Sequence, residues 1–343
     1  MKTTFSVSAL ALIAAFAASG SAAQSLNVVC SNEQDWCDLM AQNFKIDTGS
    51  DVAMVRKSTG EVLAQIRAEK GNPKVDVWWG GTGDPHLIAA SEGLTVATDV
   101  DTTGQLGWSQ NMTAISEGRA IGVHVGLLGI IYNTEVLAEK KLSVPACWRD
   151  LAKPEYKGEI QVSNPNSSGT AYTELATLVQ LFGEDEGFKL LADIGANVNQ
   201  YTKSGSAPGK AASRGETTLG IGFMHDMVKL KKAGFPVEIV SPCEGTGYEV
   251  GAVSVISGTP NMDSAKAWVE YVLSPEAQSR GLEVGVFNIP SNPASATDPE
   301  APDMASIKLI DYDFKTYGSS ATRARLLTRW EAEVKNAGGA IEN

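Results

Sequence analysis

Three short turns that combine hydroxyl side chains with glycine could bind an anion. They are Ser58-Thr59-Gly60, Gly81-Thr82-Gly83 and Ser167-Ser168-Gly169-Thr170, and each precedes a predicted helix. Free backbone N–H groups and the positive end of a helix dipole attract phosphate or carboxylate at such a position, and the hydroxyls add donors. Ordinary N-capping explains any one of these turns. Three turns on the same side of a fold instead predict an oxyanion site.

A histidine and an aspartate stand together at the end of a predicted strand, in the segment LGIGFMHDMVKL (219–230). His225 and Asp226 offer hydrogen-bond donors and acceptors side by side, which suits sugar hydroxyls that both donate and accept. Glu249 adds a further acceptor shortly before a strand that we expect to return to the first half of the chain. A structural His–Asp hydrogen bond and a metal site are the alternatives for this pair.

Other candidates have weaker support. Lys203 and Ser204, in the loop YTKSGSAPG, could add a donor, although a solvated surface lysine is the simpler interpretation. Trp78 or Trp79 could stack on a sugar, but we expect core packing for at least one of them. His86 lies in DPH, which suits a loop or helix start, and His124 lies in a strand among apolar residues, so neither is predicted to bind ligand. The predicted ligand-binding residues are therefore Ser31, Ser58, Thr59, Gly81, Thr82, Ser168, Gly169, Thr170, Lys203, Ser204, His225, Asp226 and Glu249, and no cofactor or metal is predicted.

The elements that must position these residues alternate between strands and helices. SLNVVC, DVAMVRKS and VDVWWGG are apolar strand patterns, and amphipathic helices fill the gaps between them, the second opened by a capping box at Ser58–Glu61. Short connections between alternating strands and helices predict a parallel, doubly wound α/β sheet. Residues 121–137 then form a long β-rich stretch that suits a strand crossing to a second lobe.

The second half repeats the pattern before the chain returns. Residues 250–258 suit a strand that crosses back, residues 261–278 an amphipathic helix of the first lobe, and residues 320–337 a final docking helix. The predicted fold is α/β with two lobes, each a doubly wound sheet, and two crossing strands at the hinge. In open α/β sheets, ligands gather beyond the carboxyl ends of the strands, where all the polar turns lie. The predicted parts are a signal peptide at 1–23, lobe 1 at 24–123 and 252–300, and lobe 2 at 124–251 and 301–343.

The N-terminus and the charge restrict the functional class. Lys2, the apolar run Phe5–Ala18 and the small residues at 21–23 are typical of a secretory signal peptide cleaved near Ala23. We therefore expect a bacterial periplasmic protein. The net charge of −12, with no cluster of Lys and Arg, argues against nucleic acid and acidic membranes as partners.

Four cysteines in an oxidising compartment favour disulfides, and three pairings are possible. We expect Cys30 to pair with Cys37 and Cys147 with Cys243. A metal site is the alternative, but the spacing lacks a CxxC motif and no histidine is near the first two cysteines.

Several segments together resemble a known family of proteins. STGEVLAQIRAEKGNPKVDVWWGG, GLLGIIYNTEVL, CWRDLAKPEYKGEIQVSNP and SSGTAYTELATLVQLFG resemble, in order, the solute-binding proteins of ABC importers, in the cluster of periplasmic ferric-ion-binding proteins. The resemblance covers nearly the whole mature chain. It implies a type II periplasmic-binding-protein fold, a membrane permease as partner, and a monomer that closes around a small ligand.

The resemblance also bears on the cargo. Ferric-binding members carry adjacent tyrosines at the turn that here reads GFMHDM, and this chain has no adjacent tyrosines. The hexose-phosphate-binding branch is similar in placing a His-Asp pair there and a glutamate about two dozen residues later, which match His225, Asp226 and Glu249. In that branch these residues hold sugar hydroxyls and the hydroxyl-rich turns hold phosphate on uncharged donors.

This resemblance implies a receptor for a phosphorylated sugar. The alternatives are ferric iron, a phosphonate or another organic phosphate, and, from another class, a hydrolase that uses the His-Asp pair. No GxSxG, HExxH, Walker A or GxGxxG motif in the sequence supports an enzyme.

Overall fold

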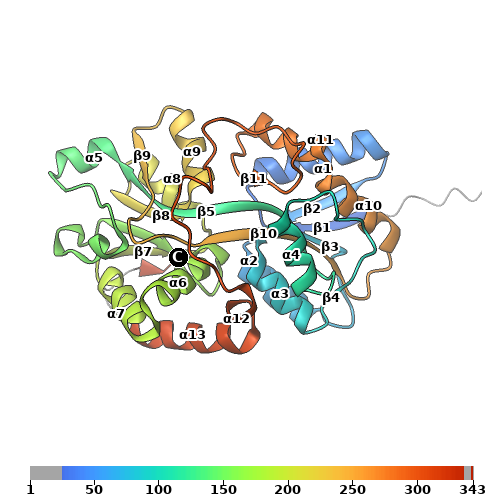
Figure 1. Cartoon of the computed structure of the whole chain (residues 1–343), viewed down its shortest axis with the longest axis horizontal. Helices are drawn as coiled ribbons and strands as arrows, with labels where there is room; N and C mark the ends of the chain where they lie inside the picture. Colours follow the sequence, from blue (N-terminus) through green and yellow to red (C-terminus); the bar gives the residue numbers. More distant parts are fainter. Residues whose placement is uncertain (1–24, 336–340, 343) are drawn as a thin grey trace, which may run out of the picture.

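The computed structural model describes residues 25–335 and 341–342, so the predicted signal peptide at 1–23 lies outside the described residues. The chain forms two α/β lobes side by side, and strands β5 (Ile121–Asn133) and β10 (Tyr248–Ile256) run between them (Figure 1). We call lobe 1 the half that contains residues 26–56 and lobe 2 the half that contains residues 160–223. The predicted two-lobe α/β fold with two crossing strands is confirmed.

Lobe 1 is built on parallel strands in the order β2-β1-β3, with β10 antiparallel beside β3. Trp79, Phe44 and Trp268 form part of its core, in which strand side chains meet the helices. The capping box is present, because the Ser58 backbone N–H donates to the Glu61 carboxylate at 3.2 Å. The elements of this region are β1 (Leu26–Cys30), α1 (Gln34–Thr48), β2 (Val52–Arg56), α2 (Thr59–Ala68), β3 (Val77–Thr82), α3 (Gly83–Ser91), β4 (Thr95–Val96) and α4 (Gly107–Ile115).

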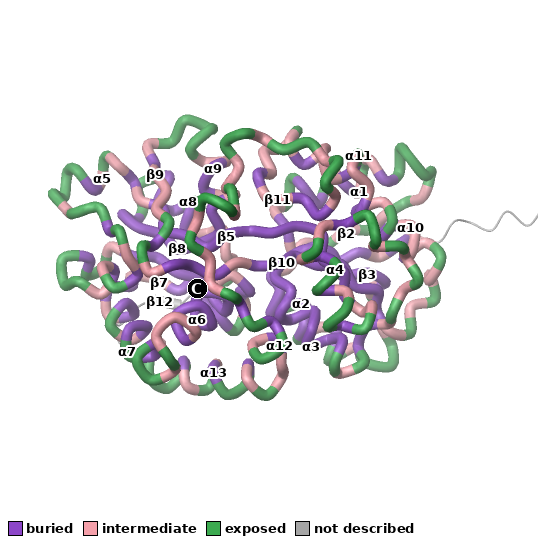
Figure 2. The backbone as a smooth tube through the Cα atoms, viewed as in Figure 1, coloured by how far each residue is buried: buried purple, intermediate pink, exposed green. Residues whose placement is uncertain are grey.

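The crossing strand β5 pairs with different partners along its length. Residues 121–127 pair with β10, and residues 128–133 pair with β8 and β9 of lobe 2. The strands of the two lobes therefore form one continuous path through β5. Figure 2 shows β5 and β10 buried along most of their length. The predicted lobe boundaries at residues 123 and 251 fall inside these two strands and stay predictions.

Lobe 2 is built on strands in the order β7-β6-β8-β5. Its core packs Trp148, Tyr156 and Phe188 against the strands. The elements of this region are α5 (Thr134–Glu139), η1 (Trp148–Ala152), η2 (Pro154–Tyr156), β6 (Ile160–Ser163), α6 (Gly169–Phe182), α7 (Glu184–Gly195), β7 (Val198–Thr202), α8 (Ala207–Ser213), β8 (Leu219–Phe223), α9 (Met224–Lys232) and β9 (Val237–Val240).

The C-terminal part of the chain contacts both lobes. Trp268 of α10 packs in the lobe 1 core as predicted, and Leu326 and Trp330 of α13 dock in the lobe 2 core. Tyr312 and Phe314 share a cluster with Leu87 of lobe 1 and with residues of lobe 2. The assignment of residues 301–343 to lobe 2 stays a prediction. The elements are α10 (Met262–Leu273), α11 (Pro275–Arg280), η3 (Gly281–Val284), β11 (Ile289–Pro290), α12 (Phe314–Tyr317), α13 (Ser320–Glu333) and β12 (Ile341–Glu342).

Both predicted disulfides, Cys30–Cys37 and Cys147–Cys243, are present. The first joins the end of β1 to α1, next to the turn that holds Ser31. The second joins two loops of lobe 2. Within residues 25–335 and 341–342, no helix has both the length and the apolar character needed to cross a bilayer.

Candidate functional site

A pocket lies between the lobes and contains about 660 Å³ of space free of protein atoms, part of it open to solvent. Of the thirteen predicted site residues, eleven line this pocket, and Lys203 and Ser204 do not. The full lining is Ser31, Asn32, Glu33, Trp36, Arg56, Ser58, Thr59, Gly81, Thr82, His124, Ser168, Gly169, Thr170, Gly205, Ser206, Phe223, His225, Asp226, Lys229, Glu249, Gly285, Val286 and Asn288.

The three hydroxyl-rich turns meet at one end of the pocket. A Cβ atom added at Gly169, at the start of α6, would lie 2.1 Å from the Thr82 hydroxyl oxygen and 2.7 Å from that of Thr59. Residues 59, 82 and 169 begin α2, end β3 and begin α6, so helix N-termini from both lobes face one small volume. Ser168 caps α6 by accepting from the Ala171 N–H at 3.4 Å. Backbone N–H groups and hydroxyls directed at one point suit a bound anion.

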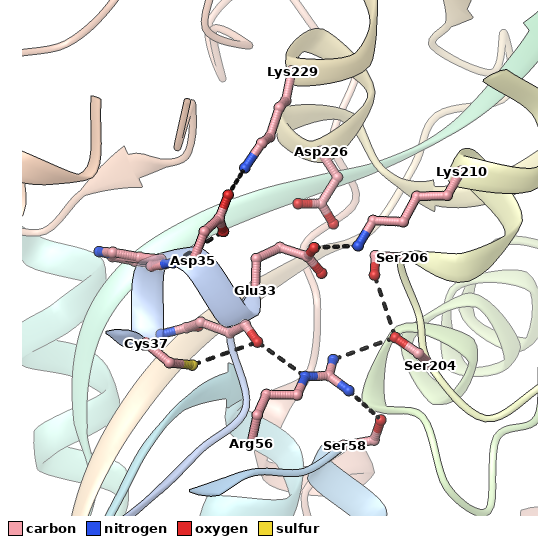
Figure 3. Close-up of polar contacts among 12 residues, drawn as sticks. Glu33, Asp35, Cys37, Arg56, Ser58, Ser204, Ser206, Lys210, Asp226 and Lys229 are labelled. Carbon is pink, nitrogen blue, oxygen red and sulfur yellow. Dashed lines mark hydrogen bonds and ion pairs between the residues drawn. The ribbon is translucent and has the colours of Figure 1, made fainter. Parts of the chain in front are cut away.

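Arg56 adds a positive charge to this end of the pocket. Its Nη1 donates to the Ser58 hydroxyl at 3.4 Å and its Nη2 to the Ser204 hydroxyl at 3.3 Å (Figure 3). The Nε donates to the Asn32 carbonyl at 3.1 Å, which fixes the plane of the guanidinium. The last residue of β2 therefore carries a guanidinium to the anion end, beside the uncharged donors that the sequence predicted.

Acidic and imidazole side chains line the other end. His225 and Asp226 lie in the first turn of α9, and the His225 Nε2 is 3.6 Å from an Asp226 oxygen, too far for a hydrogen bond. Glu249 of β10 lies 3.5 Å from the His124 Nε2. A Cβ atom at Gly126 would lie 2.7 Å from the His225 Nδ1 and 2.8 Å from a Glu249 oxygen, so both side chains reach over the bare backbone of β5.

Burial sets the protonation states of this end. Burial lowers the pKa of His225 to about 3, with the neighbouring His124 contributing, so the imidazole is neutral at pH 7. Burial raises the pKa of Asp226 well above its usual value, and the nearby Glu33 and Glu249 raise it further. For Glu33, burial opposes ionisation, but the ion pair with Lys210 outweighs it and the pKa is lowered. The pocket thus contains neutral and ionised acceptors and donors together.

Polar atoms that lack a partner gather in this pocket. Buried side-chain nitrogen or oxygen atoms without a hydrogen bond are rare in folded proteins because each one costs free energy. The described residues contain fourteen such atoms, and six belong to the lining. They are Asn32 Nδ2, Trp36 Nε1, Thr82 Oγ1, His124 Nδ1, His225 Nδ1 and Asn288 Nδ2. A polar ligand would supply the missing partners.

Two of the predicted site residues do not line the pocket. The Lys203 side chain is exposed outside the lining, and its carbonyl accepts from the Ser167 hydroxyl, because the loop after β7 turns this side chain outward. Ser204 stands behind the pocket wall, where it holds Arg56. Both residues belong to a loop whose path no local pattern in the sequence defines. Ser206 and Gly205 of that loop line the pocket instead.

The aromatic and histidine residues also divide between core and pocket. Trp78 and Trp79 are both buried in the core of lobe 1, and Trp36 lines the pocket. His86 stacks on Trp78 and donates to or accepts from Ser254 at 2.8 Å, so it is structural. His124 was not expected in the site, but it lines the pocket, because β5, which carries it, runs between the two lobes.

Sequence reasoning missed Asn32, Glu33 and Arg56, although a signal existed for each. Asn32 and Glu33 follow directly after β1, and Arg56 ends β2, so all lie at carboxyl ends of strands, where ligands gather in such sheets. Gly285, Val286 and Asn288 come from the segment after η3, and only the tertiary structure brings that segment to the pocket.

Comparisons with known proteins agree with this geometry. Residues 86–316 match the family described as bacterial extracellular solute-binding protein. An uncharacterized protein of Haemophilus influenzae is 41% identical over 98% of this chain and 99% of its own length. A putative 2-aminoethylphosphonate-binding periplasmic protein of Salmonella typhimurium is 24% identical over 81% of each chain.

Among solved structures, the periplasmic binding protein AfuA of Actinobacillus pleuropneumoniae, solved with exogenous fructose-6-phosphate bound, superimposes with a TM-score of 0.89. The two sequences are 41% identical, and the match covers 91% of this chain and 99% of that one. Together, the two-lobe fold, the interlobe pocket and these matches show that this chain belongs to the family of bacterial extracellular solute-binding proteins.

Proposed function

We propose that this protein is the periplasmic substrate-binding component of an ABC importer and that its ligand is a small phosphorylated sugar. The observation that carries the proposal is the polarity of the interlobe pocket. One end gathers hydroxyls, helix N-termini and Arg56, and the other gathers Asp226, Glu249 and two histidines. A sugar phosphate has the same polarity, with an anion at one end and hydroxyls at the other.

The phosphate would accept hydrogen bonds from residues of both lobes. Thr59 and Thr82 would donate from lobe 1 and Ser168 and Thr170 from lobe 2, with Arg56 supplying charge. Ligand contacts on both sides of the pocket favour the closed arrangement, because only a difference in affinity between the open and closed forms can shift that equilibrium. The closed form would then be presented to a membrane permease.

The hydroxyl end would determine which sugar binds. Asp226 and Glu249 can accept from ligand hydroxyls, and the unpaired Nδ1 atoms of His124 and His225 can donate or accept according to tautomer. Losing one hydroxyl from the ligand would leave a buried group unpaired, at a cost of about 1 to 3 kcal/mol. Deoxy analogues should therefore bind roughly ten- to a hundredfold more weakly.

The alternatives have less support in this pocket. Ferric iron prefers phenolate and carboxylate oxygen, and no tyrosine is among the described lining residues. A hydrolase would need a hydroxyl nucleophile within reach of a base, and His225 forms no hydrogen bond with a serine or threonine among the described residues. An aminoalkylphosphonate would satisfy the anion end, and its ammonium group would pair with an acid at the other end, but it has no hydroxyls for the remaining groups there.

Isothermal titration calorimetry of the purified protein, without its signal segment, tests the proposal. Glucose 6-phosphate or fructose 6-phosphate should bind at least tenfold more tightly than glucose, inorganic phosphate or 2-aminoethylphosphonate. No phosphate should be released over hours of incubation. Tight 2-aminoethylphosphonate binding without sugar-phosphate binding would favour the second candidate, and phosphate release would contradict a transport receptor. Native mass spectrometry of the protein as purified gives the mass of any endogenous ligand.

Export, oligomeric state and permease docking belong to the same proposal. Cleavage near Ala23 is tested by N-terminal sequencing of the protein recovered from a periplasmic extract. A monomer is expected, because each closed receptor must dock on a permease. The elution volume in size-exclusion chromatography with light scattering tests this.

A further inference from the structure

Two ion pairs join the lobes beside the pocket. Glu33 and Asp35 lie at the start of α1 in lobe 1, and their carboxylates meet lysines on helices α8 and α9 of lobe 2. The Glu33 carboxylate is 2.5 Å from the Lys210 Nζ, and Asp35 pairs with Lys229 (Figure 3).

The pairs lie where the pocket opens to solvent. Glu33 and Lys229 line the pocket, and their side chains are 19% and 31% exposed. Their partners Lys210 and Asp35 are both 46% exposed and do not belong to the lining. Each pair therefore runs from the pocket wall to the surface, and both pairs must break before the lobes can separate at this edge.

The charges at this edge also explain why a cation is needed there. Glu33 of lobe 1 faces Asp226 of lobe 2 across this edge, and its negative charge opposes ionisation of Asp226. Lys210 and Lys229 stand on either side of Asp226 along the chain, and each meets an acid of α1. The lysines thus supply lobe 2 with positive charge opposite the acids of α1, so the two lobes attract each other at this edge.

Lys232 of α9 also pairs with Asp298 and Glu300, each at 3.0 Å, in the segment that follows β11, but neither Lys232 nor these acids line the pocket. The contacts nearer the pocket are uncharged or involve one charge. The Gly60 N–H donates to the Ser167 carbonyl at 2.9 Å, and Arg56 donates to Ser204. We infer that the Glu33–Lys210 and Asp35–Lys229 pairs form a latch that favours the closed form even without ligand and slows ligand release. Each partly exposed pair should change the ratio of closed to open form by about two- to fivefold.

A charge-swap cycle at residues 35 and 229 tests the latch, and it is measured without ligand because Lys229 lines the pocket. The variants are Asp35→Lys, Lys229→Asp and the double swap, in dialysed ligand-free protein. All four native cysteines are paired, so Ile46→Cys in lobe 1 and Phe235→Cys in lobe 2 can be labelled selectively for interlobe distance measurements. Each single variant should shift the distance distribution toward the open form, and the double swap should restore it.

Two further arms complete the test. Raising the salt concentration from about 0.05 to 0.5 M should shift the ligand-free wild type toward the open form, because salt screens exposed ion pairs. The interlobe distance should change less in an Asp35→Asn/Lys229→Met variant, which lacks one of the pairs. The control swap Lys189→Asp/Asp193→Lys breaks and remakes a pair within α7 and should leave the distance unchanged. Single variants with wild-type distances, or a double swap no more closed than the single variants, would overturn the latch.

The ligand arm separates this inference from the proposed function. If glucose 6-phosphate binds, its dissociation rate by stopped flow should rise about two- to fivefold in Asp35→Lys, the variant whose position does not line the pocket. If no sugar phosphate binds, the proposed function fails, and the distance measurements on ligand-free protein still decide the latch.

Discussion

The Thr82 hydroxyl of lobe 1 lies directly over the Cα atom of Gly169 in lobe 2, where a Cβ atom would come within 2.1 Å of it. This approach is possible because residue 169 has no side chain. It places the end of β3 against the start of α6, so the donors of both lobes reach the same point.

Gly169→Ala should therefore prevent the lobes from closing over an anion. The added methyl group overlaps with the hydroxyls of Thr82 and Thr59, and overpacking of this kind costs about 1 to 3 kcal/mol. Affinity for a sugar phosphate should fall by roughly ten- to a hundredfold in calorimetry. Gly107→Ala is the matched control, because Gly107 also begins a helix but has open space around its Cα, and it should bind as the wild type does.

Thr82→Val should weaken ligand binding without lowering the stability of the fold. The Thr82 hydroxyl is buried without a partner, so its loss should leave thermal stability equal or slightly higher. If the hydroxyl donates to the ligand, affinity should fall by about tenfold or more. Thr95→Val removes another buried, unpartnered hydroxyl, in β4 and away from the pocket, and should not alter affinity. Equal affinities for the two variants would remove Thr82 from the site.

The raised pKa of Asp226 predicts a pH dependence of stability. Between the usual carboxyl value and the raised pKa, the folded protein holds a proton that the unfolded chain has lost. This contribution is fully present at low pH and is lost as the pH rises through the folded pKa. Asp226→Asn should therefore gain stability relative to wild type as the pH is raised from about 4 to 8. Urea unfolding at several pH values measures it, and a constant difference would contradict the assignment.

The lowered pKa of His225 predicts the opposite dependence of folding stability on pH. Burial lowers the pKa of His225 to about 3. Between about pH 6.5 and pH 3, the ring is therefore protonated in the unfolded chain but neutral in the folded protein. Stability from this group is present above about pH 6.5 and is lost as the pH falls toward 3. NMR titration of the His225 ring should show no protonation between pH 5 and 8. A midpoint near 6.5 would show that the ring is solvated.

The two disulfides should differ in their effect on stability. The two cysteines of the Cys147–Cys243 bond are 96 positions apart in sequence, so this bond closes a long loop. The two cysteines of the Cys30–Cys37 bond are 7 positions apart. Loop-closure entropy predicts that removing the first costs about 4 to 5 kcal/mol and removing the second about 2 kcal/mol. Paired Cys→Ala variants compared by urea unfolding give both values. A larger loss for the short loop would indicate a local packing role for the bond between β1 and α1.

Much of the fold could be predicted because the patterns that carry it are local. The apolar strands, the capping box at Ser58 and the fifteen-residue α1, which ends at Gly49 with φ of 76°, depend on near neighbours in sequence. The hydroxyl-rich turns could be recognised for the same reason, because a helix N-terminus and its donors are defined within a few residues.

Only the tertiary structure decided which side chains share the pocket. Arg56 and Glu33 reach it because β1 and β2 end beside the other lobe, and His124 reaches it because β5 passes beneath it. Lys203 does not reach it because its side chain is exposed to solvent, and Ser204 lies behind Arg56. Sequence determined the lobes and the chemistry of the turns through local propensity. The direction of side chains across the cleft depends on contacts between residues more than a hundred positions apart, which no local pattern records.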